Sequence, residues 1–186
     1  MKKLSTITVL LIFSLLISNA NYAQTDIGFK GIGGKLGYVS PEDPIESTIG
    51  FGAVFNLGQI ISSVKLDAGI DYWSKKYESG TTYLGTWETT LSEITIYALA
   101  KYYIPLSNSP IKPYGGAGLG FVIGKVSIDS PIYSDSETDS DFGIRLVGGA
   151  DYEFSPNLKV FAEVTYHTNG TDFFGIFAGV MFSTGK

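Results

Sequence analysis

The sequence VKLDAGIDYW, residues 64–73, alternates between two faces of different character. One face is wholly apolar and carries Val64, Leu66, Ala68, Ile70 and Tyr72. The other face holds every charged residue of the stretch and carries Lys65, Asp67, Gly69, Asp71 and Trp73. Successive side chains of a β-strand point to opposite faces, so this stretch predicts a strand between an apolar and a polar environment.

The same alternation recurs along most of the chain and predicts eight strands. We expect them at residues 27–39, 48–58, 62–74, 92–104, 113–127, 141–154, 158–168 and 173–183. They are much longer than the usual strand of about 5–6 residues. A tilted strand that crosses a bilayer needs ~9–11 residues, a length that all eight reach.

The connections between these segments tend to alternate in length. Long loops are expected at residues 75–91 and 128–140, and a short connection at residues 59–61. Residues 105–112 and 169–172 depart from this trend. Short periplasmic turns alternating with longer surface loops are typical of transmembrane barrels. The predicted fold is therefore all-β: an eight-stranded antiparallel up-and-down transmembrane β-barrel, with both termini on the periplasmic side.

Aromatic residues on the apolar face gather near the two ends of the predicted strands. One group contains Tyr38, Tyr72, Phe142, Tyr166 and Phe174, and the other contains Tyr102, Tyr152, Phe154 and Phe182. Amphipathic rings favour the headgroup level, so two aromatic girdles around an aliphatic band indicate that the apolar face meets lipid. The alternative is a soluble barrel or sandwich whose apolar face points inward.

The opposite face carries five basic and five acidic residues together with many glycines. The charged residues are Lys35, Lys65, Asp67, Asp71, Lys101, Arg145, Asp151, Glu153, Lys159 and Glu163. An eight-stranded barrel has an interior just wide enough to be filled by side chains. Because a buried unpaired charge is costly, we expect these residues to form a lumenal charge network, with Arg145 compensating Asp151 or Glu153.

The N-terminus predicts export. Lys2 and Lys3 precede a mainly apolar stretch at residues 4–18, which has the length of a signal-peptide core and is short for a membrane-spanning helix. We expect a cleaved signal peptide at residues 1–23, with Ala20 or Ala23 as its last residue, and one barrel domain at residues 24–186. An uncleaved helical anchor is the alternative.

Composition narrows the functional class. Charged residues make up 17% of the chain against a usual ~25%, and the mean hydropathy is +0.17. Cysteine is absent, which excludes disulfides and thiolate metal sites. The formal net charge of −5 argues against a nucleic-acid partner.

Two glycine-rich stretches carry a family resemblance. Gly31-Ile32-Gly33-Gly34-Lys35-Leu36-Gly37-Tyr38 and Pro113-Tyr114-Gly115-Gly116-Ala117-Gly118-Leu119-Gly120-Phe121 resemble strands of small OmpA/OmpX-type barrels. The resemblance covers essentially the whole mature chain. It implies a monomeric protein of the cell outer membrane, in contact with outer-membrane lipid and lipopolysaccharide. It also implies periplasmic chaperones and the barrel-assembly machinery as partners during biogenesis.

The residues that could carry chemistry are few. His167 is the only histidine, and His167-Thr168-Asn169 loosely resembles a segment of outer-membrane lipid A deacylases. Thr168 points to the face opposite His167 on a strand, so the hydroxyl nucleophile that such an enzyme needs is missing. The acidic residues of the segment at 128–140 lack the fixed spacing of an EF-hand and are expected to be solvated. We predict no catalytic, cofactor-binding or metal-binding residues.

The expected function is a structural or surface-interaction role through the extracellular loops, with a lumen filled by polar side chains. A small-solute pore is the first alternative. A membrane-embedded lipid-modifying enzyme is the second. Because a fold does not determine a function, this choice rests partly on the resemblance.

Overall fold

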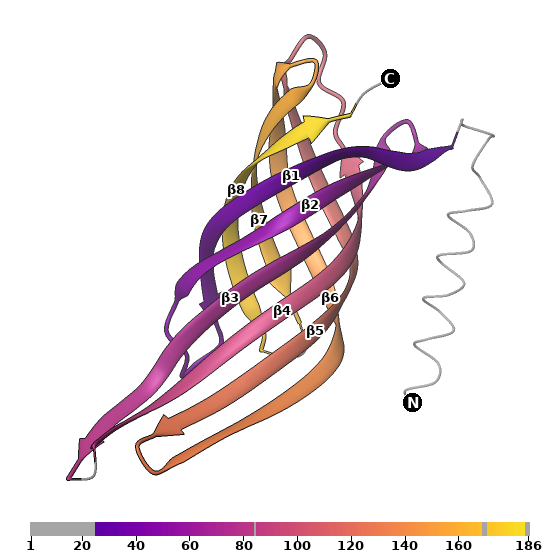
Figure 1. The fold of residues 1–186 in the computed structure, drawn as a ribbon. Helices are drawn as coiled ribbons and strands as arrows, with labels where there is room; N and C mark the ends of the chain where they lie inside the picture. Colours follow the sequence, from indigo (N-terminus) through magenta and orange to yellow (C-terminus); the bar gives the residue numbers. More distant parts are fainter. Residues whose placement is uncertain (1–24, 84, 169–170, 185–186) are drawn as a thin grey trace.

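The computed structural model describes residues 25–83, 85–168 and 171–184. Eight strands follow one another around a closed barrel (Figure 1). They are β1 (Asp26–Pro41), β2 (Thr48–Ile61), β3 (Val64–Thr82), β4 (Gly85–Tyr103), β5 (Ile111–Ser130), β6 (Tyr133–Ser155), β7 (Leu158–His167) and β8 (Phe173–Ser183). Each strand is antiparallel to the next, and β8 closes the ring on β1. The predicted eight-stranded antiparallel barrel is confirmed. The described residues contain no helix long and apolar enough to cross a membrane.

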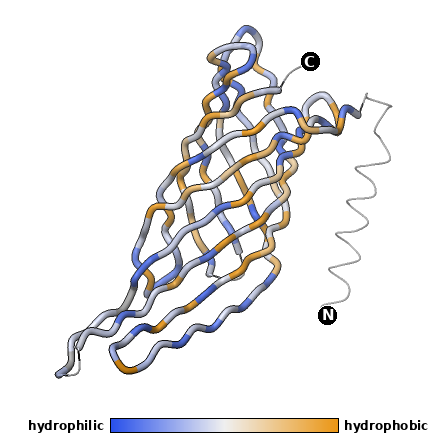
Figure 2. The backbone as a smooth tube through the Cα atoms, viewed as in Figure 1, coloured by the Kyte–Doolittle hydropathy of each residue, from blue (hydrophilic) through white to orange (hydrophobic). Residues whose placement is uncertain are grey.

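The two faces of the wall have the characters that the alternation predicts. Large apolar side chains such as Leu36, Ile49 and Leu119 are exposed by 60% or more on the outer surface. Inward residues such as Val54 and Leu99 are exposed by 2% or less. Figure 2 shows hydrophobic and hydrophilic positions alternating along the strands. This barrel therefore has apolar side chains on its outside, which suits a lipid environment.

The two ends of the barrel differ in their connections. The turns β2–β3, β4–β5 and β6–β7 lie at the end where β1 begins and β8 ends (Figure 1). The other four connections lie at the opposite end. In transmembrane barrels the longer excursions beyond the wall are extracellular. The long hairpins β3–β4 and β5–β6 project at the opposite end, so we call the first end periplasmic and the opposite end outer.

The prediction of long loops at residues 75–91 and 128–140 is wrong, because most of these residues belong to strands. β3 and β4 stay paired up to the turn between Thr82 and Gly85, and β5 and β6 up to the turn between Ser130 and Tyr133. Beyond the membrane both faces of a strand meet water, so the apolar alternation that marks a spanning strand disappears while main-chain pairing continues. The strands consequently extend well past their predicted ends.

These extensions make the barrel wall much taller on one side. β4 pairs with β5 as far as Glu88 opposite Asp129, so the extensions form one sheet. We call this the projecting sheet; it comprises residues 75–82, 85–92, 125–130 and 133–144. The ladder between β6 and β7 begins at Arg145 opposite His167, and Thr168 still bonds to the main chain of Ile144, so residues 133–141 form an edge of the sheet.

Candidate functional site

The centre of the lumen holds an ion-paired cluster around Asp71. Asp71 on β3 forms ion pairs with Lys35 on β1, whose Nζ lies 3.0 Å from Oδ2, and with Arg145 on β6, whose Nη2 lies 2.5 Å from Oδ2. The side chains of all three are exposed by no more than 3%. Three strands from different sides of the barrel therefore meet through one carboxylate.

A second cluster continues towards the periplasmic end. Lys101 Nζ lies 3.0 Å from Asp67 Oδ2 and 3.2 Å from Glu163 Oε2. The other oxygen of Glu163 lies 3.0 Å from Lys35 Nζ, so Glu163 joins the two clusters. We call these six residues, Lys35, Asp67, Asp71, Lys101, Arg145 and Glu163, the central network. Low local dielectric strengthens such pairs, and the loss of one partner leaves a costly charge.

Aromatic rings complete the central network. The Arg145 guanidinium lies 4.2 Å from the centroid of the Tyr97 ring, within cation–π range. Lys101 Nζ lies 4.5 Å from the centroid of Tyr114, and the Tyr114 hydroxyl donates to Glu163 Oε2 at 3.0 Å. Sequence reasoning did not single out these tyrosines, although both occupy inward positions of the predicted strands.

Three more predicted residues gather near the periplasmic end. Asp151 accepts from Lys159 Nζ at 2.7 Å and from the Tyr103 hydroxyl at 2.9 Å. Lys65 is half-buried, and its Nζ lies 4.6 Å from the centroid of the Tyr103 ring. Glu153 also lies at this end, opposite Lys159 on β7, but it does not join these residues in an ion pair.

Two details of the predicted charge network are wrong. Glu153 is exposed and pairs with Lys112 at 2.5 Å, because it lies near the end of β6, where the wall no longer encloses it. Arg145 does not compensate Asp151 or Glu153. Six residues along a strand span ~20 Å, so Asp151 is out of its reach, whereas Asp71 faces it across the lumen.

His167 lies towards the outer end of the lumen and is fully buried. Its ring stacks on Phe173 with centroids 5.5 Å apart. It fits there because the facing positions are glycine: a Cβ at Gly120 would lie 2.6 Å from His167 Cε1, and one at Gly143 would lie 2.7 Å from Nε2. Neither ring nitrogen has a hydrogen-bond partner among the described residues. The Thr168 hydroxyl bonds to the main chain of Ile144, and Asn169 lies outside the described residues.

A cavity of about 400 Å³ lies at the outer end, where the projecting sheet joins the barrel. We call it the outer mouth. Its carboxylates are Glu93, Glu137, Asp139 and Asp141, and its apolar wall is formed by Leu91, Val122 and Val126. Glu93 is only 1% exposed. Sequence reasoning missed it, although residue 93 has inward parity in the strand expected at 92–104.

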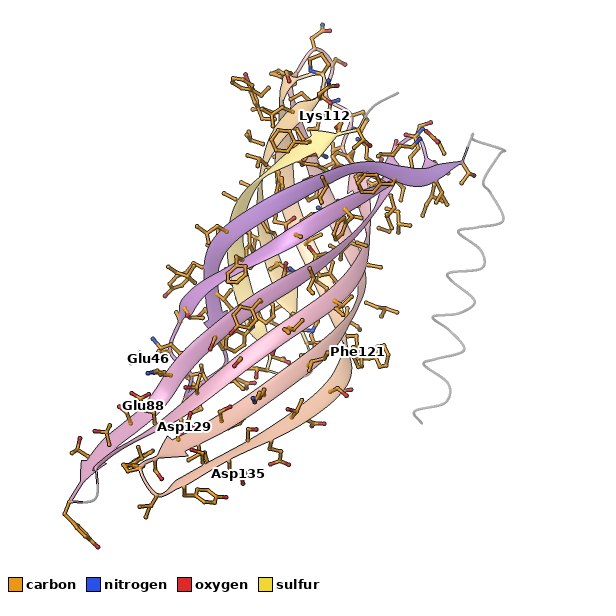
Figure 3. All side chains as sticks on the ribbon, viewed as in Figure 1. Glu46, Glu88, Lys112, Phe121, Asp129 and Asp135 are labelled. Carbon is orange, nitrogen blue, oxygen red and sulfur yellow. The ribbon has the colours of Figure 1, made fainter. Side chains whose placement is uncertain are left out.

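The acidic residues of the projecting sheet lie at the outer end, far from Lys112 at the periplasmic end. Figure 3 shows this separation for Asp129 and Asp135. Asp135 accepts a hydrogen bond of 2.7 Å from the Tyr133 hydroxyl, which lowers the pKa of the Asp135 carboxyl. Among the described residues, no group of three or more His, Cys, Asp or Glu side chains is arranged to hold a metal ion.

The residues predicted for the aromatic girdles point outward. Tyr38, Phe142, Tyr166, Phe174, Tyr102, Tyr152, Phe154 and Phe182 are each exposed by 42% or more. Tyr72 is half-buried and packs on Phe51, with ring centroids 5.3 Å apart. Their position at the headgroup level stays a prediction.

Three solved structures align with this barrel over most of their length. Neisserial surface protein A aligns with a TM-score of 0.58 and 20% identity over 82% of this chain and 95% of that chain. Ail, the attachment invasion locus protein of Yersinia pestis, aligns with a TM-score of 0.55 and 16% identity over 83% of this chain and 99% of that chain. OprG from Pseudomonas aeruginosa aligns with a TM-score of 0.58 and 13% identity over 88% of this chain and 100% of that chain. At these identities the likeness shows the fold alone. No curated protein matches the chain.

The sequence itself matches the family described as outer membrane protein β-barrel domain over residues 8–184. This match spans nearly the whole chain and agrees with the apolar outer surface and the closed ring of strands. The chain belongs to the outer membrane protein β-barrel domain family, and its place is the cell outer membrane.

Proposed function

We propose that this protein is a structural barrel that recognises a partner outside the cell through the projecting sheet. One observation carries the proposal: residues 133–141 of β6 pair with β5 but lie opposite no residue of β7, so an edge of the sheet projects beyond the membrane. An extended segment of another protein can add to such an edge as a further strand. Here its carbonyl groups would replace the Asp135 and Asp139 carboxylates, which accept from the main-chain N–H groups of Ser136 and Ser140. The extensions of β5, β4 and β3 pair in turn behind this edge strand and hold it in the sheet.

The tips of the projecting sheet offer anchors for such a partner. Tyr83 is 96% exposed, Ile132 75% and Tyr133 57%. Aromatic and large apolar side chains that stand in water beyond the membrane are typical of interaction surfaces. These three residues lie in or next to the β3–β4 and β5–β6 turns, where a partner can reach them.

The charge of the edge favours a basic partner. Asp135, Glu137, Asp139 and Asp141 alternate along β6 and are all exposed. Complementary charge steers encounters and suppresses partners of like charge. Ail has been solved with a heparin analogue, a polyanion, but the acidic edge of this chain favours the opposite charge.

The lumen gives less support to a pore. The central network draws side chains from β1, β3, β4, β6 and β7 into the middle of the barrel. An interior of this size is largely filled by its own side chains. We therefore propose a lumen closed to solutes, and no enzymatic role.

The remaining partners are proposals of the same kind. The apolar outer wall suits outer-membrane lipid, and lipopolysaccharide would surround its outer half. We propose periplasmic chaperones and the barrel-assembly machinery as partners during biogenesis only. The mature protein is proposed to be monomeric and to bind no nucleic acid.

A peptide with alternating lysine and valine tests the recognition surface, because an extended strand places all its lysines on one face. The full chain in lipid nanodiscs should bind this peptide and not the matched glutamate–valine peptide. The variants D135N and Y83S/I132S/Y133S should each weaken binding several-fold, whereas F154S at the periplasmic end should not. Equal binding of both peptides, or equal effects of all three variants, would refute the proposed surface.

A further inference from the structure

The outer mouth is large enough for a molecule. Its volume of about 400 Å³ falls within the range of ligand pockets, ~300–1,000 Å³. It lies between the inward faces of β4, β5 and β6 and opens at the outer end. At Gly124, which lines it, an added Cβ would meet nothing within 4 Å, so this wall is open space and not a packed core.

The charge of the outer mouth is one-sided. Its lining includes four acidic residues, Glu93, Glu137, Asp139 and Asp141, and no lysine or arginine. The ion pairs formed within residues 25–83, 85–168 and 171–184 involve none of these four. A concave site lined by one sign of charge concentrates ligands of the opposite sign. The outer mouth should therefore attract cations.

Glu93 is the buried acidic residue of the outer mouth, and its carboxylate is held by hydrogen bonds. Its Oε1 accepts from Trp73 Nε1 at 3.3 Å and from Thr95 Oγ1 at 3.2 Å, and the backbone of Thr171 provides a further hydrogen bond. All three donors are neutral, and Arg145 is already paired with Asp71. Glu93, the one buried carboxylate of the four, is thus held in place by neutral hydrogen-bond donors and forms no ion pair within the described residues.

The walls beside Glu93 are apolar. Leu91 lines the cavity and belongs to a buried cluster with Trp73 and Phe173, against which Val126 packs. A hydrated metal ion gains nothing from such walls, whereas the methylenes of an organic cation lose contact with water there. The ligand should therefore carry both amines and an aliphatic chain.

The spacing of the carboxylates on β6 also favours a ligand that carries several amines. Glu137, Asp139 and Asp141 lie on one face of β6, and alternate residues of a strand are ~7 Å apart. No group of three or more such side chains among the described residues converges on a metal position. Carboxylates in a row match a chain of amines separated by short runs of methylenes better than one ion.

We propose that the outer mouth is a binding site for a linear polyamine. One terminal ammonium pairs with Glu93, the methylenes lie along Leu91, Val122 and Val126, and the remaining amines face the acidic residues of β6. This site shares Glu137, Asp139 and Asp141 with the acidic edge of the recognition surface proposed above. Glu93 and the apolar wall belong to the outer mouth alone, whereas Asp135 and the exposed tips do not line it.

Calorimetric titration of the full chain in nanodiscs with a linear triamine tests the proposal. The wild type should bind it saturably, and E93Q and D139N/D141N should each weaken binding tenfold or more. D135N is the matched control: it removes the next carboxylate of the same row outside the cavity and should change affinity less than twofold. Gel mobility without heating checks that each variant is folded.

Three results would overturn the proposal. They are the absence of saturable binding, an equal effect of D135N and D139N/D141N, and displacement of the triamine by an equimolar amount of Mg²⁺. D139N/D141N alters only exposed residues, so the test holds even where E93Q fails to fold. Loss of triamine binding in E93Q with unchanged binding of the lysine–valine peptide would separate this site from the recognition surface.

Discussion

The middle of the lumen and its outer mouth both contain buried carboxylates, but the partners of these carboxylates differ. Asp71 and Glu163 each lie within 3.2 Å of two basic side chains. Glu93, which is just as buried, is held by neutral donors alone. Burial is therefore compensated by ion pairs where the barrel must be closed and stable, and by hydrogen bonds where the lumen opens outward. This difference separates a structural role for the middle from a binding role for the mouth.

The largest expected effect comes from breaking the central network. Arg145→Ala should lower the free energy of unfolding by about 3–5 kcal/mol, because Asp71 is then left with Lys35, which Glu163 also needs. Urea titration of the protein in bilayers, read by gel mobility, measures the loss. Lys112→Ala, which breaks only the exposed pair with Glu153, should cost less than about 1 kcal/mol. Equal costs would mean that the lumen is as well hydrated as the surface.

The second prediction contrasts the outer wall with the projecting sheet. Val160→Arg should destabilise the barrel by about 2–4 kcal/mol if the site lies near the bilayer midplane, and by less nearer a rim. Leu66→Arg should behave in the same way. Ser136→Arg in the projecting sheet should cost little, because that strand meets water on both faces. Tolerance of arginine at residues 66 and 160 would contradict a lipid-facing wall.

The third prediction concerns the outer mouth. Glu93→Gln should change the free energy of unfolding by no more than about 1 kcal/mol, because an amide can keep a hydrogen bond and no cation is left unpaired. The same urea titration measures it beside Arg145→Ala. A loss as large as that of Arg145→Ala would show that Glu93 has a structural role like that of the central network.

The smallest expected effect is on catalysis. His167→Ala should leave any hydrolysis of lipid A by the purified protein unchanged, because the His167 ring is fully buried and neither nitrogen meets a hydroxyl among the described residues. Assays of acyl release from lipid A by both proteins provide the check. Deacylation by the wild type that is lost in the variant would reverse the assignment.

The spanning part of each strand could be predicted from sequence because lipid outside and side chains inside impose a period of two. Residues 64–73 show this directly. The extensions of β3 to β6 could not be predicted, because beyond the membrane no apolar face marks the strand. Residues such as those at 133–141 look like a solvated loop until main-chain pairing is known.

The sequence predicted which charged side chains point into the lumen more accurately than which of them form ion pairs with one another. Inward parity identified Lys35, Asp71 and Arg145, but which side chains meet depends on distances across the barrel, and sequence does not contain these. Glu153 was misplaced because parity does not say where the wall ends. Glu93 was missed because a single acidic residue near a predicted strand end gives no signal of burial.

Planar-bilayer recording of the refolded wild type tests the closed lumen most directly. With the middle of the barrel filled by the central network, no large and stable ohmic conductance should appear at physiological salt. Large, steady, ohmic currents from the wild type would mean that water and ions already pass between these charges, and the closed lumen would be contradicted.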